Sequence, residues 1–299
     1  MNKDTSSQEE MQKKSHLYKG IVYIAMILLF LAVGWLGFRL FSFGEPIKTT
    51  SSEPTSLPKA TPAIPPAREQ NDLLKIATEV PDTGEKYCYL TFDDGPTKEV
   101  TPAVLDALKA ENVKATFFLL GRMIEKNPDI AKRVHEEGHL LANHTYSHQY
   151  EELYATGESF LAEVEKTNGL IKDIIGEEPF RLIRFPGGSQ NAGTYGAQKQ
   201  QYKLLLQENG FYFADWNSLN GDAEGHNRSP GELLARIRET SGSKNIVVLM
   251  HDAATKKSTP QALSSIIQYL REKGYTFKRL DEVPYYTEDH LPPEPDLIL

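Results

Sequence analysis

The sequence has little cysteine and no excess of basic residues, and both shortages exclude whole classes of protein. Cys88 is the single cysteine among 299 residues, so neither an internal disulfide framework nor a multi-cysteine zinc cluster can form. It lies in an alternating apolar run, which is typical of a buried core thiol. The formal net charge of -8 argues against a general nucleic-acid binder, because the basic stripe that such proteins need is missing.

Long apolar runs are also scarce, with one exception near the N-terminus. Residues 21–38 (IVYIAMILLFLAVGWLGF) carry no charge. At about 1.5 Å of rise per residue, such a helix just crosses a bilayer core of about 30 Å. Lysines precede the run more densely than basic residues follow it, which places the N-terminus in the cytoplasm. A cleaved signal peptide is the competing interpretation, but no small-residue cleavage pattern follows directly, so we favour an uncleaved anchor.

The rest of the chain divides by composition, which is otherwise ordinary for a globular protein at 39% hydrophobic and 25% charged residues. A segment rich in Pro, Ser and Thr follows the apolar run and cannot build a core, so we predict a spacer there. The predicted organisation has five parts: a cytoplasmic tail (1–20), a transmembrane anchor (21–38), an extracellular linker (39–84), one folded domain (85–290) and a short tail (291–299).

Within the folded domain, short β-branched or aromatic runs alternate with amphipathic helical windows. The predicted strands are 87–92, 115–120, 139–142, 181–185, 211–214, 246–250 and 276–280. Several helical windows begin with a cap residue and a proline, as at Thr101, Asn127, Ser229 and Thr259. Gly138, Gly210 and Gly274 lie where helices should end. Strands that alternate with helices predict the α/β class, with a parallel sheet and helices outside it.

Unusual polar residues follow five of the predicted strands. They are Asp93-Asp94, His144 with His148, Arg184, Asp215 and His251-Asp252. The carboxyl ends of strands are where α/β folds place their sites. An open doubly wound sheet would also fit the alternation, but charges from five strands that meet at one rim suit a barrel better. We therefore predict an incomplete (β/α) barrel of parallel strands.

The chemistry-bearing motifs are individually weak. Asp93 and Asp94 precede a Gly-Pro turn and could be a solvated turn, while an H-x-x-x-H pair is usually due to chance or packing. On one rim, however, the imidazoles of His144 and His148 at helical spacing and one carboxylate would form a three-ligand site. Such a site leaves an open position, as in catalytic zinc centres, where water takes the remaining place.

Three further motifs also have ordinary structural explanations when taken alone. Arg184 at a strand end could clamp a carboxylate, and the glycines after it let a substrate approach backbone N–H groups that stabilise an oxyanion. Asp215 beside Trp216 offers a carboxylate and an apolar wall. His251 follows an apolar strand, where a structural histidine is the usual case. It becomes a general-acid candidate only because the other polar motifs are predicted on the same rim.

The ordered motifs TFDDGP, HTYSH, RFPGG, DW and LMHD resemble those of the polysaccharide deacetylase family (NodB-like, carbohydrate esterase family 4). The resemblance covers the folded domain over about 200 residues and implies metal-dependent N-deacetylation of N-acetylated sugar polymers on a deformed barrel. It implies a catalytic base, Asp93, and three metal ligands, Asp94, His144 and His148.

The resemblance also implies the roles of the remaining motif residues. Arg184 would hold the base carboxylate, and His251 would be the catalytic acid, oriented by Asp215. Trp216 and Leu249 would shape the pocket for the acetyl methyl group. The family often has Tyr after the proline of its third motif, where this chain has Gly187. The backbone N–H of Gly187 can still bind an oxyanion, but the aromatic side chain that could line the sugar cleft is missing.

We therefore expect a hydrolase that releases acetate from N-acetylglucosamine units. An outward-facing, membrane-tethered domain lies beside the cell wall, which makes peptidoglycan the first choice of substrate. N-acetylmuramic acid, chitin oligomers and exopolysaccharide remain alternatives. So do a catalytically silent wall-binding module and an amidase that cuts stem peptides. One divalent metal is expected, and zinc fits the ligands, although cobalt, nickel or manganese could occupy them. The sequence indicates no nucleic-acid partner and identifies no protein partner.

Overall fold

The computed structural model describes residues 72–74, 84–191, 193–225 and 227–283. The predicted anchor over 21–38 and the tail over 291–299 lie outside these residues. Among the helices that are described, none combines the length and the apolar character needed to cross a membrane.

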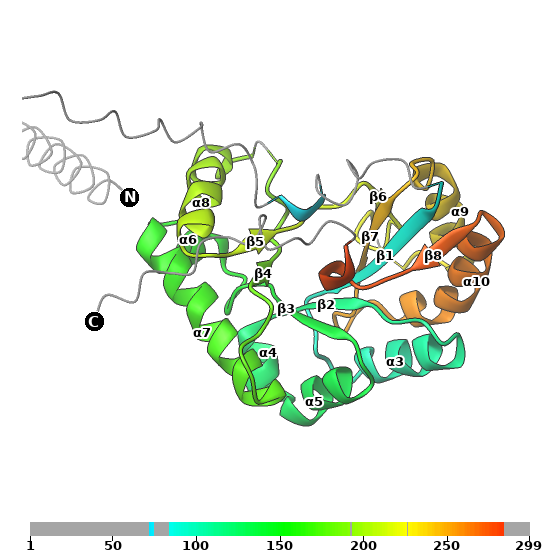
Figure 1. Cartoon of the computed structure of the whole chain (residues 1–299), viewed down its shortest axis with the longest axis horizontal. Helices are drawn as coiled ribbons and strands as arrows, with labels where there is room; N and C mark the ends of the chain where they lie inside the picture. Colours follow the sequence, from blue (N-terminus) through cyan, green and yellow to red (C-terminus); the bar gives the residue numbers. More distant parts are fainter. Residues whose placement is uncertain (1–71, 75–83, 192, 226, 284–299) are drawn as a thin grey trace, which may run out of the picture. The chain divides into compact units, whose positions relative to one another are not determined.

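Eight short strands form one curled sheet in which all pairings are parallel. Their order is β5-β4-β3-β2-β1-β7-β6, and β8 pairs with β1 off this path. The sheet curls into an incomplete barrel (Figure 1), which confirms the predicted fold class. The strands are β1 (Lys86–Asp93), β2 (Thr116–Leu119), β3 (Leu140–Asn143), β4 (Leu182–Ile183), β5 (Tyr212–Phe213), β6 (Ser218–Leu219), β7 (Ile246–His251) and β8 (Tyr275–Phe277).

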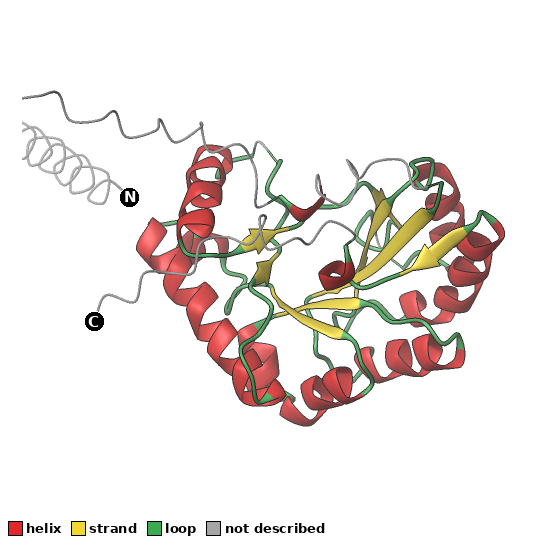
Figure 2. Cartoon of the chain, viewed as in Figure 1, coloured by secondary structure: helices red, strands yellow, loops and turns green. Residues whose placement is uncertain are grey.

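Helices cover the outer face of the curled sheet (Figure 2). They are α3 (Thr101–Ala110), α4 (Gly121–Lys126), α5 (Pro128–Glu136), α6 (Tyr150–Leu153), α7 (Gly157–Ile175), α8 (Gly196–Glu208), α9 (Pro230–Thr240) and α10 (Ser258–Glu272). A 3₁₀ turn, η1 (Leu280–Glu282), packs Leu280 into the interior cluster instead. The predicted stop signals are confirmed, since Gly138, Gly210 and Gly274 follow helices with positive φ.

The predicted helix caps differ in outcome. Ser229 caps α9 and forms a reciprocal capping box with Glu232. Thr101 and Thr259 were predicted as caps as well, but each lies inside the first turn of its helix. Their hydroxyls instead donate to Asp252 and Asp222, two carboxylates at the carboxyl rim of the sheet. The cap pattern was therefore misleading at these two positions because the hydroxyls serve the rim.

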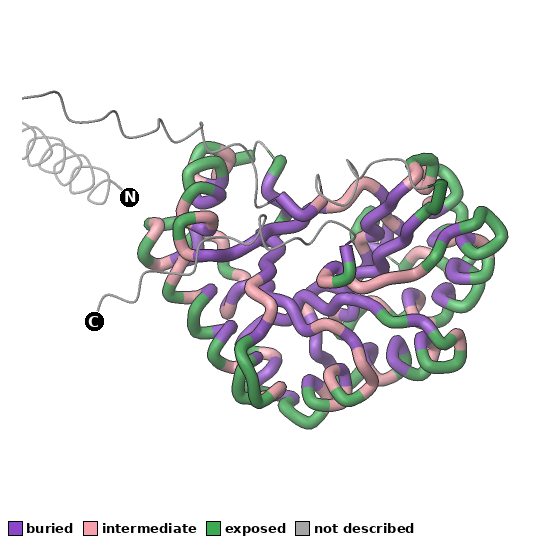
Figure 3. The backbone as a smooth tube through the Cα atoms, viewed as in Figure 1, coloured by how far each residue is buried: buried purple, intermediate pink, exposed green. Residues whose placement is uncertain are grey.

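Residues of β1 alternate between two apolar layers, as a strand's period of two requires. Cys88, Leu90 and Phe92 pack outward beneath the helices. Tyr87 and Tyr89 point into the barrel interior. The buried strands stand out from the exposed outer loops and helix faces in Figure 3. This alternation continues to the strand end, so the inner row finishes on Asp93 at the carboxyl rim.

Residues just before the folded domain also contribute to it. Leu73 is buried in the interior cluster, and Asp72 forms a parallel bridge with Phe213 of β5. The sequence analysis placed this segment in the linker, because the region is rich in Pro, Ser and Thr. The packed part of the chain therefore includes residues upstream of the predicted start at residue 85.

Candidate metal and acid–base site

Three candidate ligands converge beyond the ends of β1 and β3. Asp94 Oδ1 lies 3.6 Å from His144 Nε2 and 3.6 Å from His148 Nε2. The ligand atoms of all three residues lie within 4.8 Å of one another. Two ligands bound at about 2.1 Å to one tetrahedral ion are about 3.4 Å apart, so these separations suit a shared divalent cation.

The two histidines reach this point from a loop, and the helical spacing invoked for them was wrong. Residues 144–149 lie between β3 and α6 without regular structure. Thr145 and His148 have φ values of 67° and 57°, in the left-handed region. The loop turns back on itself through these positions, and this brings His148 beside His144, with ring centroids 5.2 Å apart.

The protonation of His144 fits a metal ligand. Its Nδ1 lies 2.8 Å from the Arg184 carbonyl oxygen, which can only accept, so Nδ1 carries the proton. Burial lowers the pKa of His144 to about 3 against the opposing charge of Asp94. The ring is therefore neutral, and Nε2, which lies 3.6 Å from Asp94 Oδ1, carries a lone pair that can bind a metal. Two imidazoles and one carboxylate match the donor set of a catalytic zinc-type site.

Glu163 of α7 holds the histidine loop in place. Its Oε2 accepts from the backbone N–H groups of Tyr146 and Ser147, at 3.2 and 3.0 Å. Its Oε1 accepts from the Ser147 hydroxyl at 2.5 Å. Tyr146 and Ser147 lie between the two histidines in the chain, so Glu163 helps to fix the distance between His144 and His148.

The Glu163→Gln substitution is therefore expected to weaken metal binding by about tenfold, as loss of a group that supports a ligand does. The amide nitrogen cannot accept, so either the Ser147 hydroxyl or the two backbone N–H groups lose their acceptor, and the negative charge that strengthens all three hydrogen bonds is removed. Competition with a fluorescent chelator measures the change. Glu125→Gln is the matched control, because Glu125 contacts this loop only through the Tyr146 phenol. Equal metal affinity in the parent and Glu163→Gln would contradict the role of Glu163.

Asp93 is the candidate base, and Arg184 holds it as predicted. Its Oδ1 accepts from Arg184 Nη1 at 2.9 Å, while its Oδ2 lies 3.8 Å from His144 Nε2. Arg184 is fully buried in the barrel interior and also donates to the Ala214 and Asp215 carbonyls. Burial raises the pKa of Asp93 above its ordinary value, against the charge of Arg184, which makes the carboxylate a stronger base.

The loop after β4 presents a free backbone donor at the site. Lys199 Nζ donates to the carbonyls of Pro186 and Gly188, at 3.1 and 2.8 Å, and the Asn191 amide donates to the Gly187 carbonyl. The carbonyls of this turn are thus occupied. Among the described residues, the Gly187 N–H has no acceptor. It can serve as the oxyanion donor predicted from the sequence.

His251 is held by Asp222, and not by Asp215 as predicted. Its Nδ1 lies 2.7 Å from Asp222 Oδ1, and its backbone N–H donates to Asp222 Oδ2 at 2.8 Å. Burial acts to lower the pKa of His251. The hydrogen bond and charge of Asp222, with the charges of Asp93 and Asp94, outweigh burial and raise the pKa to about 9. The imidazolium is therefore available as an acid at neutral pH.

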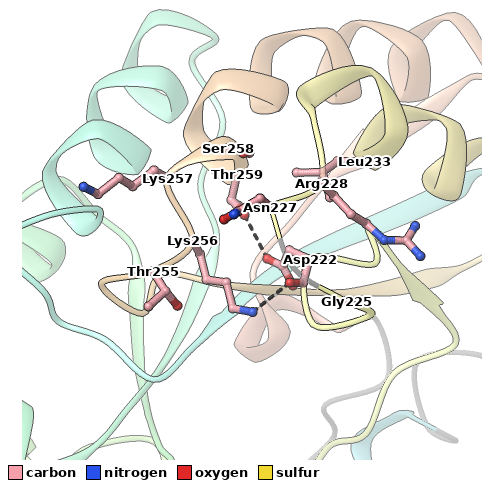
Figure 4. A pocket seen from close by; sticks show the side chains of 10 residues that line it. All are labelled: Asp222, Gly225, Asn227, Arg228, Leu233, Thr255, Lys256, Lys257, Ser258 and Thr259. Atoms are coloured by element: carbon pink, nitrogen blue, oxygen red, sulfur yellow. Dashed lines mark hydrogen bonds between the residues drawn. The ribbon is translucent and has the colours of Figure 1, made fainter.

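Asp222 is itself fixed from its far side. Figure 4 shows Lys256 and Thr259 beside it, at a cavity of about 170 Å³. Thr259 Oγ1 donates to Asp222 Oδ2 at 2.9 Å, and Lys256 Nζ donates to the Asp222 carbonyl at 2.7 Å. The sequence carried a signal for Asp222, since it follows an Asn-Gly turn past a strand. That strand, β6, has only two residues and was not predicted.

Asp215 instead anchors the loop that carries Gly187. Its two carboxylate oxygens accept from the Ser189 N–H at 2.8 Å and from the Ser189 hydroxyl at 2.6 Å. The correction has a simple geometric cause. Asp215 follows β5, at one end of the open sheet, whereas His251 ends β7, beside the opposite end strand β6. Asp222 follows β6 and is therefore the carboxylate within reach of His251.

A small cavity of about 190 Å³ lies next to His251. Trp216 and Leu249, the predicted methyl-pocket residues, both line it, together with Leu219. Trp216 packs directly against the backbone of Gly188. It can do so because Gly188 has no side chain, since a Cβ there would lie 2.8 Å from the indole ring. The structure thus brings the predicted site residues together around one rim. The difference is that Asp215 bonds to Ser189 and not to His251.

The comparisons with known proteins agree with this geometry. A family model described as polysaccharide deacetylase matches residues 81–205. A peptidoglycan-N-acetylglucosamine deacetylase of Bacillus cereus is 30% identical over 285 residues, which cover 94% of this chain and 96% of that protein.

Solved structures match the fold as well. The catalytic domain of a peptidoglycan N-acetylglucosamine deacetylase from Eubacterium rectale has a TM-score of 0.62 at 33% identity, and the match covers 68% of this chain and 92% of that domain. A mutant of a CE4 family pseudoenzyme with restored enzymatic activity has a TM-score of 0.56 at 28% identity, with 67% of each chain covered.

Proposed function

The chain belongs to the polysaccharide deacetylase family, and we propose that it removes N-acetyl groups from N-acetylglucosamine units of peptidoglycan, releasing acetate. Membership of this family makes it a hydrolase that acts on an N-acetyl amide. The observation that carries the proposal is the convergence at one rim of three ligand atoms within 4.8 Å of one another, with a base and an acid beside them. Two of the similar proteins are peptidoglycan N-acetylglucosamine deacetylases, and the site of this chain has the groups that the reaction needs.

The metal, held by Asp94, His144 and His148, would supply Lewis-acid activation of the acetyl carbonyl and of water. Asp93 takes a proton from the attacking water at Oδ2, since Arg184 occupies Oδ1. The Gly187 N–H donates to the oxygen on which negative charge develops. His251 gives the proton on Nε2 to the leaving amine nitrogen, because Asp222 holds Nδ1. Trp216 and Leu249 enclose the acetyl methyl group.

Removal of the metal tests this account directly. The full-length chain is expected to lose acetate release from N-acetylglucosamine oligomers to the level of buffer when stripped with a chelator. Stoichiometric zinc should restore the rate, and parallel additions of cobalt, nickel and manganese rank the alternatives. Acetate is measured by a coupled assay and bound metal by mass spectrometry. Full activity in protein that retains no metal would contradict the proposal.

We further propose that the domain acts outside the cell, tethered by residues 21–38. The charge asymmetry around that run and its length support this placement. Amino-sugar analysis of the wall from cells that lack the protein tests the substrate. An unchanged level of N-acetylation would remove peptidoglycan and leave chitin oligomers or exopolysaccharide. Separate quantification of free glucosamine and free muramic acid distinguishes the two wall sugars.

A silent wall-binding module is the principal alternative, because the family includes a pseudoenzyme. The retained ligands, base and acid all argue for catalysis here, since a binding module has no need of them. Polymer binding without acetate release in metal-supplemented protein would favour the silent module. New peptide termini in the digest, in place of free amino groups on sugars, would indicate an amidase.

A further inference from the structure

Gly187 lacks the aromatic side chain that the family often carries at this motif position, and the structure shows what takes its space. A Cβ built on Gly187 would lie 2.7 Å from the hydroxyl oxygen of Tyr150. Gly187 also has a φ of 71°, which favours glycine. A side chain at position 187 and Tyr150 in its present position exclude each other.

Tyr150 is the first residue of α6 and follows the metal-ligand loop directly. Its ring and that of His148 form an edge-to-face pair, with centroids 5.4 Å apart and an angle of 73° between the planes. Its other contacts are stacked, with Tyr195 at 6.1 Å and 8° and with Tyr154 at 5.8 Å and 29°. Aromatic contacts on several sides hold the ring in one orientation.

The hydroxyl of Tyr150 is not used by the fold. It has no hydrogen-bond partner among the residues that the structure describes, and the side chain is only partly buried. The tyrosines that serve the loops differ in this respect, since Tyr154, for example, donates to the Pro186 carbonyl at 3.0 Å. Tyr150 thus places an available donor between a metal ligand and the Gly187 oxyanion donor.

We propose that Tyr150 is a substrate-binding residue that replaces, from a different element, the cleft-lining side chain that position 187 lacks. Its hydroxyl donates a hydrogen bond to an oxygen of the N-acetylhexosamine unit, and the exposed part of its ring contacts that sugar. The proposal rests on the proposed function. Lys199 and Asn191 fix the turn around Gly187, so the distance between the hydroxyl and the backbone donor is set by the protein and not by the substrate.

Two substitutions separate the hydroxyl from the ring. Tyr150→Phe is expected to raise the KM for an N-acetylglucosamine oligomer about fivefold, the effect of one hydrogen bond. Tyr150→Leu removes the ring as well and is expected to raise KM by about 30-fold. The kcat should stay within about twofold of the parent in Tyr150→Phe, because binding that is equal in the ground and transition states changes KM alone.

Tyr202→Phe is the matched control, because it removes a hydroxyl of the same aromatic cluster that makes a single 3.5 Å contact with the Tyr154 carbonyl. Bound metal is measured in every variant. An unchanged KM in both Tyr150 variants at full metal content would overturn the proposal. So would a loss of activity that follows loss of metal at constant KM, since Tyr150 would then act only on His148.

Calorimetry of oligomer binding to each holoprotein keeps this test separate from the proposed function. If the parent binds the oligomer and releases no acetate, the deacetylase assignment fails, while a weaker affinity in the Tyr150 variants still supports this inference. Equal affinity in the parent and both variants overturns it whether or not the protein turns over. A parent that neither binds nor cleaves the oligomer overturns both.

Discussion

Asp93→Asn is expected to lower the rate of acetate release by about 10³-fold at neutral pH while the protein keeps its metal. This corresponds to about 4 kcal/mol of transition-state stabilisation. Asparagine has the same shape as aspartate but cannot accept a proton from water. Asp93 is not one of the three proposed ligands, so the metal content should not follow the activity. The combination of full metal and lost turnover is the expected signature of a missing base.

The same substitution leaves the buried charge of Arg184 without its partner, and this must be separated from catalysis. Removal of one member of a buried ion pair costs about 3–5 kcal/mol of stability. The remaining hydrogen bonds of Arg184, to the carbonyls of Ala214 and Asp215 and to the Thr91 hydroxyl, offset part of that loss. Thermal unfolding of the parent and variant shows whether the assay temperature lies below both transitions.

Asp252→Asn is the control for Asp93→Asn. Asp252 is a second buried carboxylate at the same rim, and burial raises its pKa to about 7. Its side chain contacts Thr101 and not the ligands, so the amide should retain most of the activity. A rate within tenfold of the parent for Asp93→Asn, in folded and metal-loaded protein, would show that another group takes the proton.

Part of this site was predictable because its residues follow the two longest strands of the sheet. The strands β1 and β7 have eight and six residues, so Asp93, Asp94 and His251 at their ends were easily placed on one rim. Arg184 was placed correctly although β4 has two residues, because the sequence around it forms a recognisable apolar run. Parallel pairing then brings these positions together, since Asp93 lies opposite His251 in the register.

The predictions that were wrong depended on contacts that no local pattern encodes. His144 and His148 do meet Asp94, as predicted, but for a different reason, because the loop and Glu163 bring them together and no helix does. Asp215 and Asp222 each follow a short strand. Which of the two reaches His251 depends on sheet order, and sheet order is not visible in the spacing. The approach of Tyr150 to Gly187 likewise joins two loops through tertiary packing.

Asp222→Asn tests the corrected assignment through the pH dependence of kcat/KM. The general acid must be protonated, so activity is lost as pH rises through the pKa of His251. That pKa is raised to about 9 chiefly by Asp222, acting against burial. Without the carboxylate, burial dominates and the pKa falls toward or below the ordinary 6.5. The alkaline limb of the profile should therefore move to lower pH.

The asparagine variant also loses geometry, which adds to the effect on rate. Asp222 accepts from the Nδ1–H and the backbone N–H of His251 and from Thr259, and an amide cannot accept on both of its terminal atoms. We expect kcat at pH 8 to fall by about 10²-fold, within the range of general-acid catalysis. Initial rates of acetate release between pH 5 and pH 10 measure both changes.

Asp215→Asn decides between the two carboxylates. Its side chain holds Ser189, so its loss should disturb the oxyanion loop and lower kcat without moving the alkaline limb. A limb that moves in Asp215→Asn and stays in place in Asp222→Asn would restore the assignment made from the motif order. An alkaline limb that moves only in Asp222→Asn would establish that Asp222 is the group that keeps His251 protonated. Asp222 follows β6, the strand that the sequence analysis did not predict.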